Sequence, residues 1–447
     1  MSEEKAPAPR PDATRARTVV GTFVLHLRPV RVPEGAIRLT HTFGLGGMSL
    51  VLLLVLAATG SLLMLVYRPL PGEAYESVTR LQEAVPFGAF VRAVHHWSAN
   101  ALIVVAFLHL LRVFLTGGHR EGRELNWLVG LGLLAGVAGS CFTGYLLPWD
   151  QLAYWAVTIV TGMAGYVPLA GSRLATLLRG GIEIGPSTLI NYYALHTQWL
   201  PATIFFLAGF HFWRVRKAGG VVLPPDAPRD ESGAPRRVLF LPNLLWKETA
   251  LSLSLLAAVT LFAALVRAPL GAAANPGMSP NPAKAPWYFL GFQELLVHLH
   301  PVFAVVVFPL AGALALSLLP YLPAEAGPRG AWFLSETGKQ AAKLAAAVSL
   351  VSVPLFVAAD ELIQLSLGSG AAAGGAVGLL VRGLLPAVAV GGGSAFFYRF
   401  VRKRFAAGRL EATQAVFVLL VTGFALLTVA GIWFRGPGMR LTWPWRT

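Results

Sequence analysis

The sequence has few charged residues and almost no cysteine. Charged residues make up 13% of its 447 residues, about half the fraction found in an ordinary soluble domain. A large soluble α/β enzyme is therefore a poor interpretation. The single cysteine, Cys141, excludes an internal disulfide, a Cys-x-x-Cys-His haem attachment and a cysteine-held iron–sulfur cluster. Because Cys141 lies in an apolar run, we interpret it as a small buried residue.

The beginning of the chain also lacks a prompt apolar core. Its first residues are rich in Arg and Pro, whereas a cleavable signal peptide needs an apolar segment close to its start. We expect residues 1–40 to form a cytoplasmic tail. The net charge is +15, but the basic residues cluster in loops between apolar runs. Anionic lipid is therefore the expected counter-charge, and nucleic acid is not an expected partner.

Long uncharged stretches are what the sequence does contain. Hydrophobic residues make up 55% of the chain, and a run of about 20 of them can cross a bilayer as a helix. The pattern predicts an all-α, polytopic transmembrane helix bundle of about nine spans. The eighth span contains Arg382, Pro386 and three consecutive glycines, so we expect it to be kinked or half inserted. The predicted spans cover 48–67, 97–115, 127–147, 197–213, 249–266, 301–321, 343–366, 374–398 and 412–434.

The loops between these spans alternate in charge. Cytoplasmic loops of membrane proteins carry an excess of Lys and Arg, which predicts a cytoplasmic N-terminus, a periplasmic C-terminus and a location in the bacterial inner membrane. The basic segments are the N-terminal tail and the loops 116–126, 214–247, 322–343 and 399–409. The charge-poor or longer loops are 68–93, 148–195 and 267–300.

Four histidines lie in the apolar runs in a regular arrangement. His95 and His109 are 14 residues apart on one predicted helix, and His196 and His211 are 15 apart on another. At about 100° and 1.5 Å per residue, each pair returns to one helix face and spans about 21–22 Å. Two such helices facing each other present two His–His pairs, which suits two stacked haems ligated from both sides. The alternative for any single histidine is a satisfied hydrogen bond between helices.

Glycines and arginines accompany these histidines. Gly46 and Gly60, like Gly130 and Gly144, are 14 residues apart, which echoes the histidine spacing and allows close approach of a flat macrocycle. Helix packing is the other explanation for such glycines. Two arginines each lie three residues from a histidine and are candidates for pairing with haem propionates, the alternative being snorkelling to the membrane surface; they are Arg92 and Arg112.

Several stretches resemble cytochrome b6 and its relatives in bc1 complexes. They are Arg92-Ala93-Val94-His95-His96-Trp97-Ser98-Ala99, Leu108-His109-Leu110-Leu111-Arg112-Val113, Thr143-Gly144-Tyr145-Leu146-Leu147-Pro148-Trp149-Asp150-Gln151 and Leu195-His196-Thr197 with His211. From about 240 to 325 the chain resembles subunit IV of the b6f branch, with Ala285-Pro286-Trp287-Tyr288 at the quinol-site Pro-Glu-Trp-Tyr motif. The likeness is strong over about 40–220, moderate over 240–325 and faint beyond.

The resemblance implies a function and a division of the chain. It implies a cytochrome b subunit of a quinol:cytochrome c oxidoreductase that binds two non-covalent haem b groups. His95 and His196 would hold the haem on the periplasmic side, and His109 and His211 the cytoplasmic one. Quinol would be oxidised under the 267–300 loop, and a second quinone would be reduced near the cytoplasmic haem. The implied segments are a tail 1–40, a dihaem domain 41–220, a linker 221–247, a quinol-site domain 248–325 and additional helices 326–447.

Partners follow from the same resemblance. Since iron–sulfur and c-haem motifs are missing, a Rieske-type iron–sulfur protein and a c-type cytochrome must be separate subunits, in a complex that the resemblance implies is dimeric. Menaquinone or ubiquinone, with membrane lipid, completes the expected set. Two rivals remain open: a dihaem membrane anchor of a quinone-linked dehydrogenase or reductase, and a transporter without cofactor.

Two departures from the family pattern affect the expected chemistry. Gly44 stands where b6 proteins attach an extra haem through cysteine, so that haem is not expected to be covalently held. Pro286 replaces the motif glutamate, so another proton acceptor is needed beside Trp287, Tyr288 and Tyr145. Glu294 is the only acid between Glu248 and Glu325. We expect it to share the face of Trp287, with its pKa raised by burial to act as a general base; pairing with Lys284 is the alternative, and His298 and His300 compete for the role.

Overall fold

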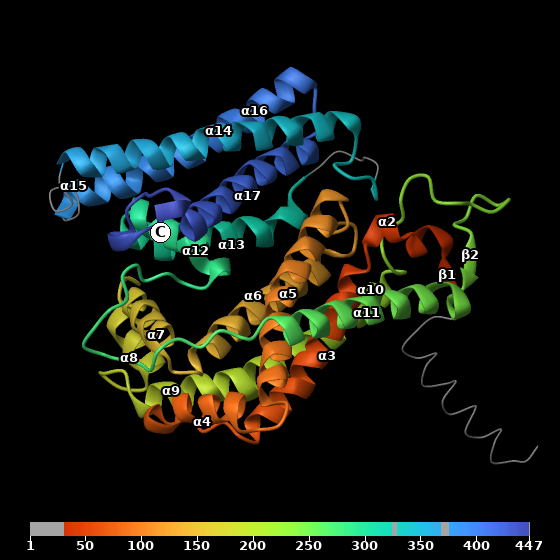
Figure 1. Cartoon of the computed structure of the whole chain (residues 1–447). Coiled ribbons are helices and arrows are strands. Elements are labelled where there is room, and N and C mark those ends of the chain that lie inside the picture. The colour runs from red at the N-terminus through yellow and green to blue at the C-terminus, as the bar shows by residue number, and fades with distance from the viewer. Residues whose placement is uncertain (1–30, 324–328, 368–374, 447) are drawn as a thin grey trace, which may run out of the picture.

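The computed structural model describes residues 31–323, 329–367 and 375–446, and the described part is built almost wholly from helices (Figure 1). The exceptions are loops and one small antiparallel sheet, in which β1 (Arg31–Pro33) pairs with β2 (Arg237–Leu239). The arginines of the N-terminal tail before residue 31, on which part of the orientation argument rests, lie outside the described residues.

All nine stretches expected to span the membrane lie mainly in helices over the residues that the structure describes. Eight described helices are long and apolar enough to cross a bilayer. The remaining stretch, 197–213, lies in η2 (Leu195–Trp199) and α10 (Leu200–Lys217), and the last turn of α10 carries Arg214, Arg216 and Lys217. The eight are α3 (Leu45–Met64), α5 (Gly88–Leu115), α6 (Glu124–Leu146), α11 (Phe240–Leu265, apolar from Asn243), η4 to η5 (Phe303–Tyr321), α14 (Glu336–Leu367), α15 to α16 (Gly375–Phe405) and α17 (Arg409–Trp433).

The first half of the chain forms a bundle of α3, α5, α6 and α10. In this bundle α3 packs on α5, α5 on α6 and α6 on α10, while α11 lies against α3 and α5 (Figure 1). Its middle layer is aliphatic and includes Leu52, Leu102, Val137, Ile204 and Val259. Because lipid is as apolar as these side chains, close van der Waals packing holds such helices together.

The second half forms a separate stack of helices, drawn in blue and teal in Figure 1. Here α17 packs on α14, on α16 and on the short α12 (Leu290–His298). Small residues line the contacts among the long helices and let their backbones approach; those buried include Ala341, Ala345, Ala412 and Ala415.

In the described part of the chain, three spans each contain one wide π turn, and a proline follows each turn. The turns are η2, η4 (Phe303–Val307) and η6 (Leu380–Leu384), with Pro201, Pro309 and Pro386 just beyond them. A proline cannot donate to the carbonyl four residues earlier, and a π turn is one way to accommodate the break. The eighth span is thus irregular at η6, as expected, but Gly375–Phe405 is long enough to cross the membrane completely.

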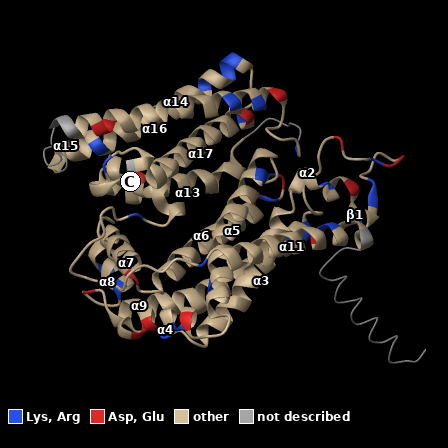
Figure 2. Ribbon diagram, in the orientation of Figure 1, with Lys and Arg blue, Asp and Glu red and all other residues tan. Residues whose placement is uncertain are grey.

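The loops meet at two opposite ends of the helices. At one end, called the basic end here, Arg38 pairs with Asp226, Arg123 donates to Gly220 O, and Gly330 N donates to Thr116 O. At the other end, Arg92 donates to the carbonyl oxygens of Ala268 and Pro269, and Tyr75 to that of Gly271. Figure 2 shows Lys and Arg gathered near α2 (Leu39–Thr42), β1 and the end of α16.

Short helices cover the end opposite the basic end. Their aromatic and aliphatic core includes Leu146, Trp149, Val157, Leu189 and Tyr192. The short helices are α4 (Pro71–Glu83), α7 (Gln151–Ala164), α8 (Gly171–Arg179) and α9 (Pro186–Ala194). Helix α9 continues directly into η2 (Leu195–Trp199), so this layer also fixes the position of His196.

Candidate haem and quinol sites

The four histidines singled out by their spacing meet as two cross-helix pairs. The rings of His95 and His196 have their centroids 6.2 Å apart, and those of His109 and His211 are 6.3 Å apart. Each pair joins α5 to the η2–α10 segment. The spacing of 14 residues on α5 and 15 on its partner is matched because the π turn η2 absorbs about one extra residue.

The gap between the rings fits a metal ion ligated from both sides. Two metal–nitrogen bonds of about 2 Å, together with the inner halves of two imidazole rings, come to about 6 Å. Among the described residues there is no group of three or more His, Cys, Asp or Glu that could hold a metal ion. Two protein ligands per site leave the other coordination positions to a bound macrocycle, so the residues present fit haem.

Hydrogen bonds orient the first pair of rings. His95 Nδ1 lies 2.9 Å from Thr59 Oγ1, and the Thr59 hydroxyl itself donates to Val55 O. The hydroxyl must therefore accept from His95 Nδ1–H. His196 Nδ1 lies 3.0 Å from Ser140 O and donates to it. With Nδ1 protonated in both rings, Nε2 is the nitrogen left free to ligate.

Each predicted glycine lies against one of the four histidines. A Cβ added to Gly144 would lie 2.5 Å from His196 Cε1, and one added to Gly60 would lie 3.2 Å from His95 Cε1. At the other level, Gly46 faces His109 and Gly130 faces His211, each at 3.5 Å. The four glycines therefore keep side chains away from the imidazole rings, most strictly at Gly144.

The pair toward the basic end has a different environment. His211 Nδ1 is buried without a hydrogen-bond partner. Arg112 is buried and donates to His41 O, while its Nη2 lies 2.9 Å from His41 Nε2. Arg92, at the opposite end, is held by Gln82, Ala268 O and Pro269 O. Both predicted propionate partners are thus held by protein groups at the ends of the bundle.

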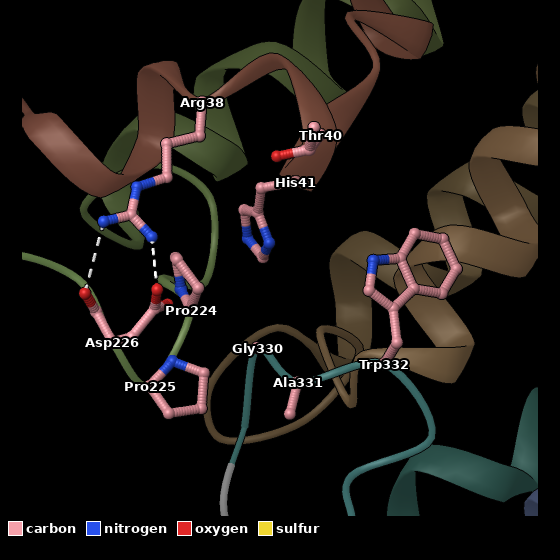
Figure 3. A pocket seen from close by; sticks show the side chains of 9 residues that line it. All are labelled: Arg38, Thr40, His41, Pro224, Pro225, Asp226, Gly330, Ala331 and Trp332. Atoms are coloured by element: carbon pink, nitrogen blue, oxygen red, sulfur yellow. Dashed lines mark hydrogen bonds and ion pairs between the residues drawn. The ribbon is translucent and has the colours of Figure 1, made fainter. Parts of the chain in front are cut away.

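A cavity of about 320 Å³ opens at the basic end beside His41 (Figure 3). Arg38 and Asp226 close one side through an ion pair, and Trp332 forms the opposite wall. Burial lowers the pKa of His41 and outweighs its hydrogen bond to Val222 O. Because His41 contacts Arg112, which follows His109 by three residues, the cavity lies just beyond the second histidine pair.

The residues of the expected quinol motif lie at the other end. Trp287 opens the short η3 (Trp287–Phe289) and donates from Nε1 to Asn100 Oδ1 of α5 at 2.7 Å. Trp287 also borders an apolar groove of about 540 Å³ between α5 and α11. Burial raises the pKa of Tyr288, and the nearby Cys141 and Tyr145 add to this effect. The ring of the next residue, Phe289, lies 5.8 Å from that of Phe142, so η3 packs against the end of α6 that carries Tyr145.

Glu294 does not share the environment of Trp287. It is fully buried on α12, and both of its carboxylate oxygens accept from Arg435 at 2.8–3.1 Å. Burial raises the pKa of Glu294, but the hydrogen bonds from His298 and Arg435 lower it more, so the net direction is down. The expectation of a raised pKa is wrong. The alternative partner, Lys284, instead donates to Ile432 O.

Several residues of this region were missed by sequence reasoning. Arg435 follows the last apolar run by one residue and looks like an ordinary interfacial cation. Asn100 lies inside an apolar run, and this position was the one sequence feature that indicated an interaction between helices, since an amide there needs a partner. Its partner was unpredictable because Trp287 is 187 residues away.

Gly44 and Cys141 also bear on haem attachment. Gly44 has a left-handed backbone with φ +61°, and an added Cβ would lie 2.1 Å from the Leu251 side chain. A cysteine at this position would therefore need Leu251 to move. Cys141 Sγ lies 3.8 Å from Ala99 O, within the helix bundle.

The fold and the paired histidines define a membrane-embedded cytochrome of the b type, and the sequence comparisons agree. The chain matches the family model described as cytochrome b/b6/petB over residues 33–219. It is 43% identical over 175 residues to cytochrome b6 of Prochlorococcus marinus, covering 39% of this chain and 80% of that protein. It is 45% identical over 177 residues to cytochrome b6 of Tupiella akineta, covering 39% and 81%. This chain belongs to the cytochrome b/b6 family, and membership implies that it binds haem b.

The fold extends beyond the family segment. A chain of a solved hyperthermophilic respiratory Complex III matches 94% of this chain and 97% of its own length, with a TM-score of 0.67 and 22% sequence identity. At this identity the match shows the fold, and it includes the α11–α17 half.

Proposed function

We propose that this chain is the cytochrome b subunit of a quinol:cytochrome c oxidoreductase, which oxidises quinol at the end opposite the basic end. It carries electrons across the membrane to a second quinone site, coupled to proton translocation. The observation that carries the proposal is the pair of histidine couples at 6.2 and 6.3 Å, placed at two levels of one helix bundle. A helix–helix hydrogen bond needs no such gap between rings.

The proposed roles of the histidines follow from their geometry. His95 and His196 hold one haem b and His109 and His211 the other, each through Nε2. When bound, the haems would supply one-electron carriers. The chain's own contribution is to fix ring orientation through Thr59 and Ser140 and to leave space at Gly46, Gly60, Gly130 and Gly144.

The proposed quinol site lies between α6 and η3. Tyr145 and Tyr288 provide hydroxyl groups that can donate a hydrogen bond to a quinol oxygen or accept one from it. Trp287 is held by Asn100 and forms the apolar wall. Glu294 supports this site from behind, paired with Arg435, rather than acting as the base.

The proposed second quinone site is the cavity at the basic end. A quinone presents two carbonyl acceptors, and Arg38, Thr40 and His41 border the cavity with donor groups (Figure 3). Trp332 offers an apolar face for the ring.

The proposed orientation places the basic end in the cytoplasm of a bacterium. Lys and Arg concentrate there, as the positive-inside rule requires, and the quinol site then faces the periplasm. A Rieske-type iron–sulfur protein and a c-type cytochrome would accept electrons on that side, in a dimeric complex. Reporter fusions after Arg409 and after Thr447 should report opposite sides.

A spectroscopic experiment tests the function. The purified complex should show about two haems per chain by pyridine haemochrome, extractable with acid acetone, and quinol should reduce them. Absence of haem bands would exclude the proposal. Quinol reduction of haem without any acceptor protein in the complex would instead indicate a dihaem anchor.

A further inference from the structure

Among the described residues, the most strongly buried Arg and Glu side chains lie outside both histidine pairs. Arg435 and Glu294 are 0% exposed, and His298 is 2% exposed. Arg435 Nη1 also donates to Glu361 Oε2 at 2.9 Å, and His298 Nδ1 lies 2.6 Å from Asp360 Oδ2. Ionisable groups in such a position are costly and call for a functional explanation.

This cluster joins three elements that are far apart in the sequence. Glu294 and His298 belong to α12, Asp360 and Glu361 to α14, and Arg435 follows α17. His298 Nε2 lies 3.0 Å from Arg435 Nη2 and 3.4 Å from Glu294 Oε2. His298 Nδ1 carries a proton, because it faces the Asp360 carboxylate, which only accepts. Every charged group is satisfied within the cluster.

Residues 434–442 form a hairpin around Arg435, called the C-terminal hairpin here. Thr442 N donates to Phe434 O, and Gly436 N donates to Arg440 O. Glu361 ties both arms, because it accepts from Arg435 and from Leu441 N. The hairpin is therefore anchored to α14 as well as to α12.

The same hairpin and the end of α17 hold the loop that leads into the quinol motif. Gly438 N donates to Asn281 Oδ1, and Lys284 Nζ donates to Ile432 O. Gln293 of α12 clamps the next residues, since its amide donates to Ala283 O and accepts from Ala285 N. Pro286, Trp287 and Tyr288 follow at once.

Helix α12 is also fixed by contact with α17. A Cβ on Gly291 would lie 2.7 Å from Phe424 and Thr428, and one on Gly431 would lie 2.9 Å from Leu290 Cβ. These two glycines allow close approach of the helices, so α17 blocks a shift of α12 toward it. The ion pair between Glu294 and Arg435 also ties α12 to the C-terminal hairpin.

From these contacts we propose that the C-terminal hairpin is a clamp for the quinol site, with Arg435 as a positioning residue acting through Glu294 and α12 on Trp287 and Tyr288. The inference rests on the proposed quinol oxidation and gives the helices beyond residue 326 a role in it. The geometry of a reacting pair is sensitive, since a displacement of about 1 Å can cost on the order of 10²-fold in rate.

The test compares Arg435→Gln with Arg440→Gln in the purified complex. Arg440 is exposed on the same hairpin, which makes it the matched control. We expect Arg435→Gln to lower quinol turnover per bound haem by on the order of 10²-fold, with a raised KM and unchanged dithionite-reduced spectra. Arg440→Gln should match wild type. Arg435→Lys, which keeps the charge but loses the planar fork, should fall between them.

A purely structural role would give a different result. It would lower the amount of haem-loaded complex but leave KM and turnover per haem unchanged, and this outcome overturns the clamp. If Arg435→Gln does not assemble, Asn281→Ala and Lys284→Met cut the two outer ties and leave the buried ions intact. A severalfold loss in kcat/KM supports the clamp, and wild-type values for both overturn it. A wild-type complex that fails to oxidise quinol would overturn the proposed function itself.

Discussion

The two halves of this protein bury polar groups in opposite ways. The bundle of α3, α5, α6 and α10 buries two pairs of imidazole rings whose centroids are 6.2 and 6.3 Å apart. The stack of α12, α14 and α17 buries full charges that saturate one another around Arg435. The first arrangement leaves room between the rings for a ligand, whereas in the second the charged groups bind one another. The first is therefore suited to hold a cofactor, and the second to hold helices in position.

The largest expected effect comes from removing a haem ligand in the histidine bundle. His196→Leu removes one ligand of the His95 pair, and we expect complete loss of that haem with the other retained. Haem content should fall from about two to about one per chain. His109→Leu should remove the other haem, so the two variants should show different residual spectra. Full haem content in either variant would contradict the assignment of ligands.

A graded effect is expected at the glycines. Gly144→Ala places a methyl group 2.5 Å from His196 Cε1, whereas Gly46→Ala places one at an ordinary 3.5 Å from His109 Cε1. We therefore expect Gly144→Ala to lower haem occupancy and Gly46→Ala to have little effect. Equal occupancy in the two variants would show that the glycines do not set the ring positions. Haemochrome titration of both measures this.

The contribution of the buried charges around Arg435 to stability is tested by Glu294→Gln. Removing one partner of a buried ion pair costs about 3–5 kcal/mol, and we expect the lower end of this range because Glu361 still pairs with Arg435. Thermal unfolding of the complex should show a lower Tm. Glu336→Gln is the control, because Glu336 pairs with Lys339 at 80% side-chain exposure and such surface pairs contribute about 0–1 kcal/mol. Equal Tm values for both variants would contradict the assignment.

A smaller effect is expected at the hydrogen bond between Trp287 of the quinol motif and Asn100 of α5. Asn100→Leu removes the acceptor of the Trp287 indole, a hydrogen bond contributing about 1 kcal/mol, so KM for quinol should rise severalfold. Trp287→Phe removes the donor. The double variant should be no worse than the poorer single variant, as expected for two residues acting through one contact. Additive losses would mean that the contact is unimportant.

The smallest expected effect concerns pH. The pKa of Glu294 lies below its ordinary value of 4.5 in the folded protein. A lowered folded-state pKa contributes stability that is fully present above the unfolded-state pKa and is lost as the pH falls through the folded value. The stabilising contribution of Glu294 to the Tm should therefore stay constant between pH 8 and pH 5 and should be lost only below about pH 4.5. The drop should be shallower in Glu294→Gln. A Glu294-dependent change near neutral pH would contradict the lowered pKa.

The histidine half could be predicted in detail, and the other half could not. His95, His109, Gly46 and Gly60 lie on single helices, where periodicity determines which residues share a face. Glu294 was correctly picked out as isolated from other acids, but its environment was misjudged. An isolated carboxylate in an apolar segment suggests a raised pKa, and this inference fails when a cation arrives from another helix. Arg435 is 141 residues away.

By itself, the sequence determined the apolar helices, the alternation of their loops and the two histidine levels, because these depend on helical repeat and on the free energy of placing side chains in lipid. Only the tertiary structure decided that the π turn η2 matches a 15-residue spacing to one of 14, and that Arg435 neutralises Glu294. Both depend on how separate helices pack, and packing in lipid is set by close contacts between particular side chains that no single segment encodes.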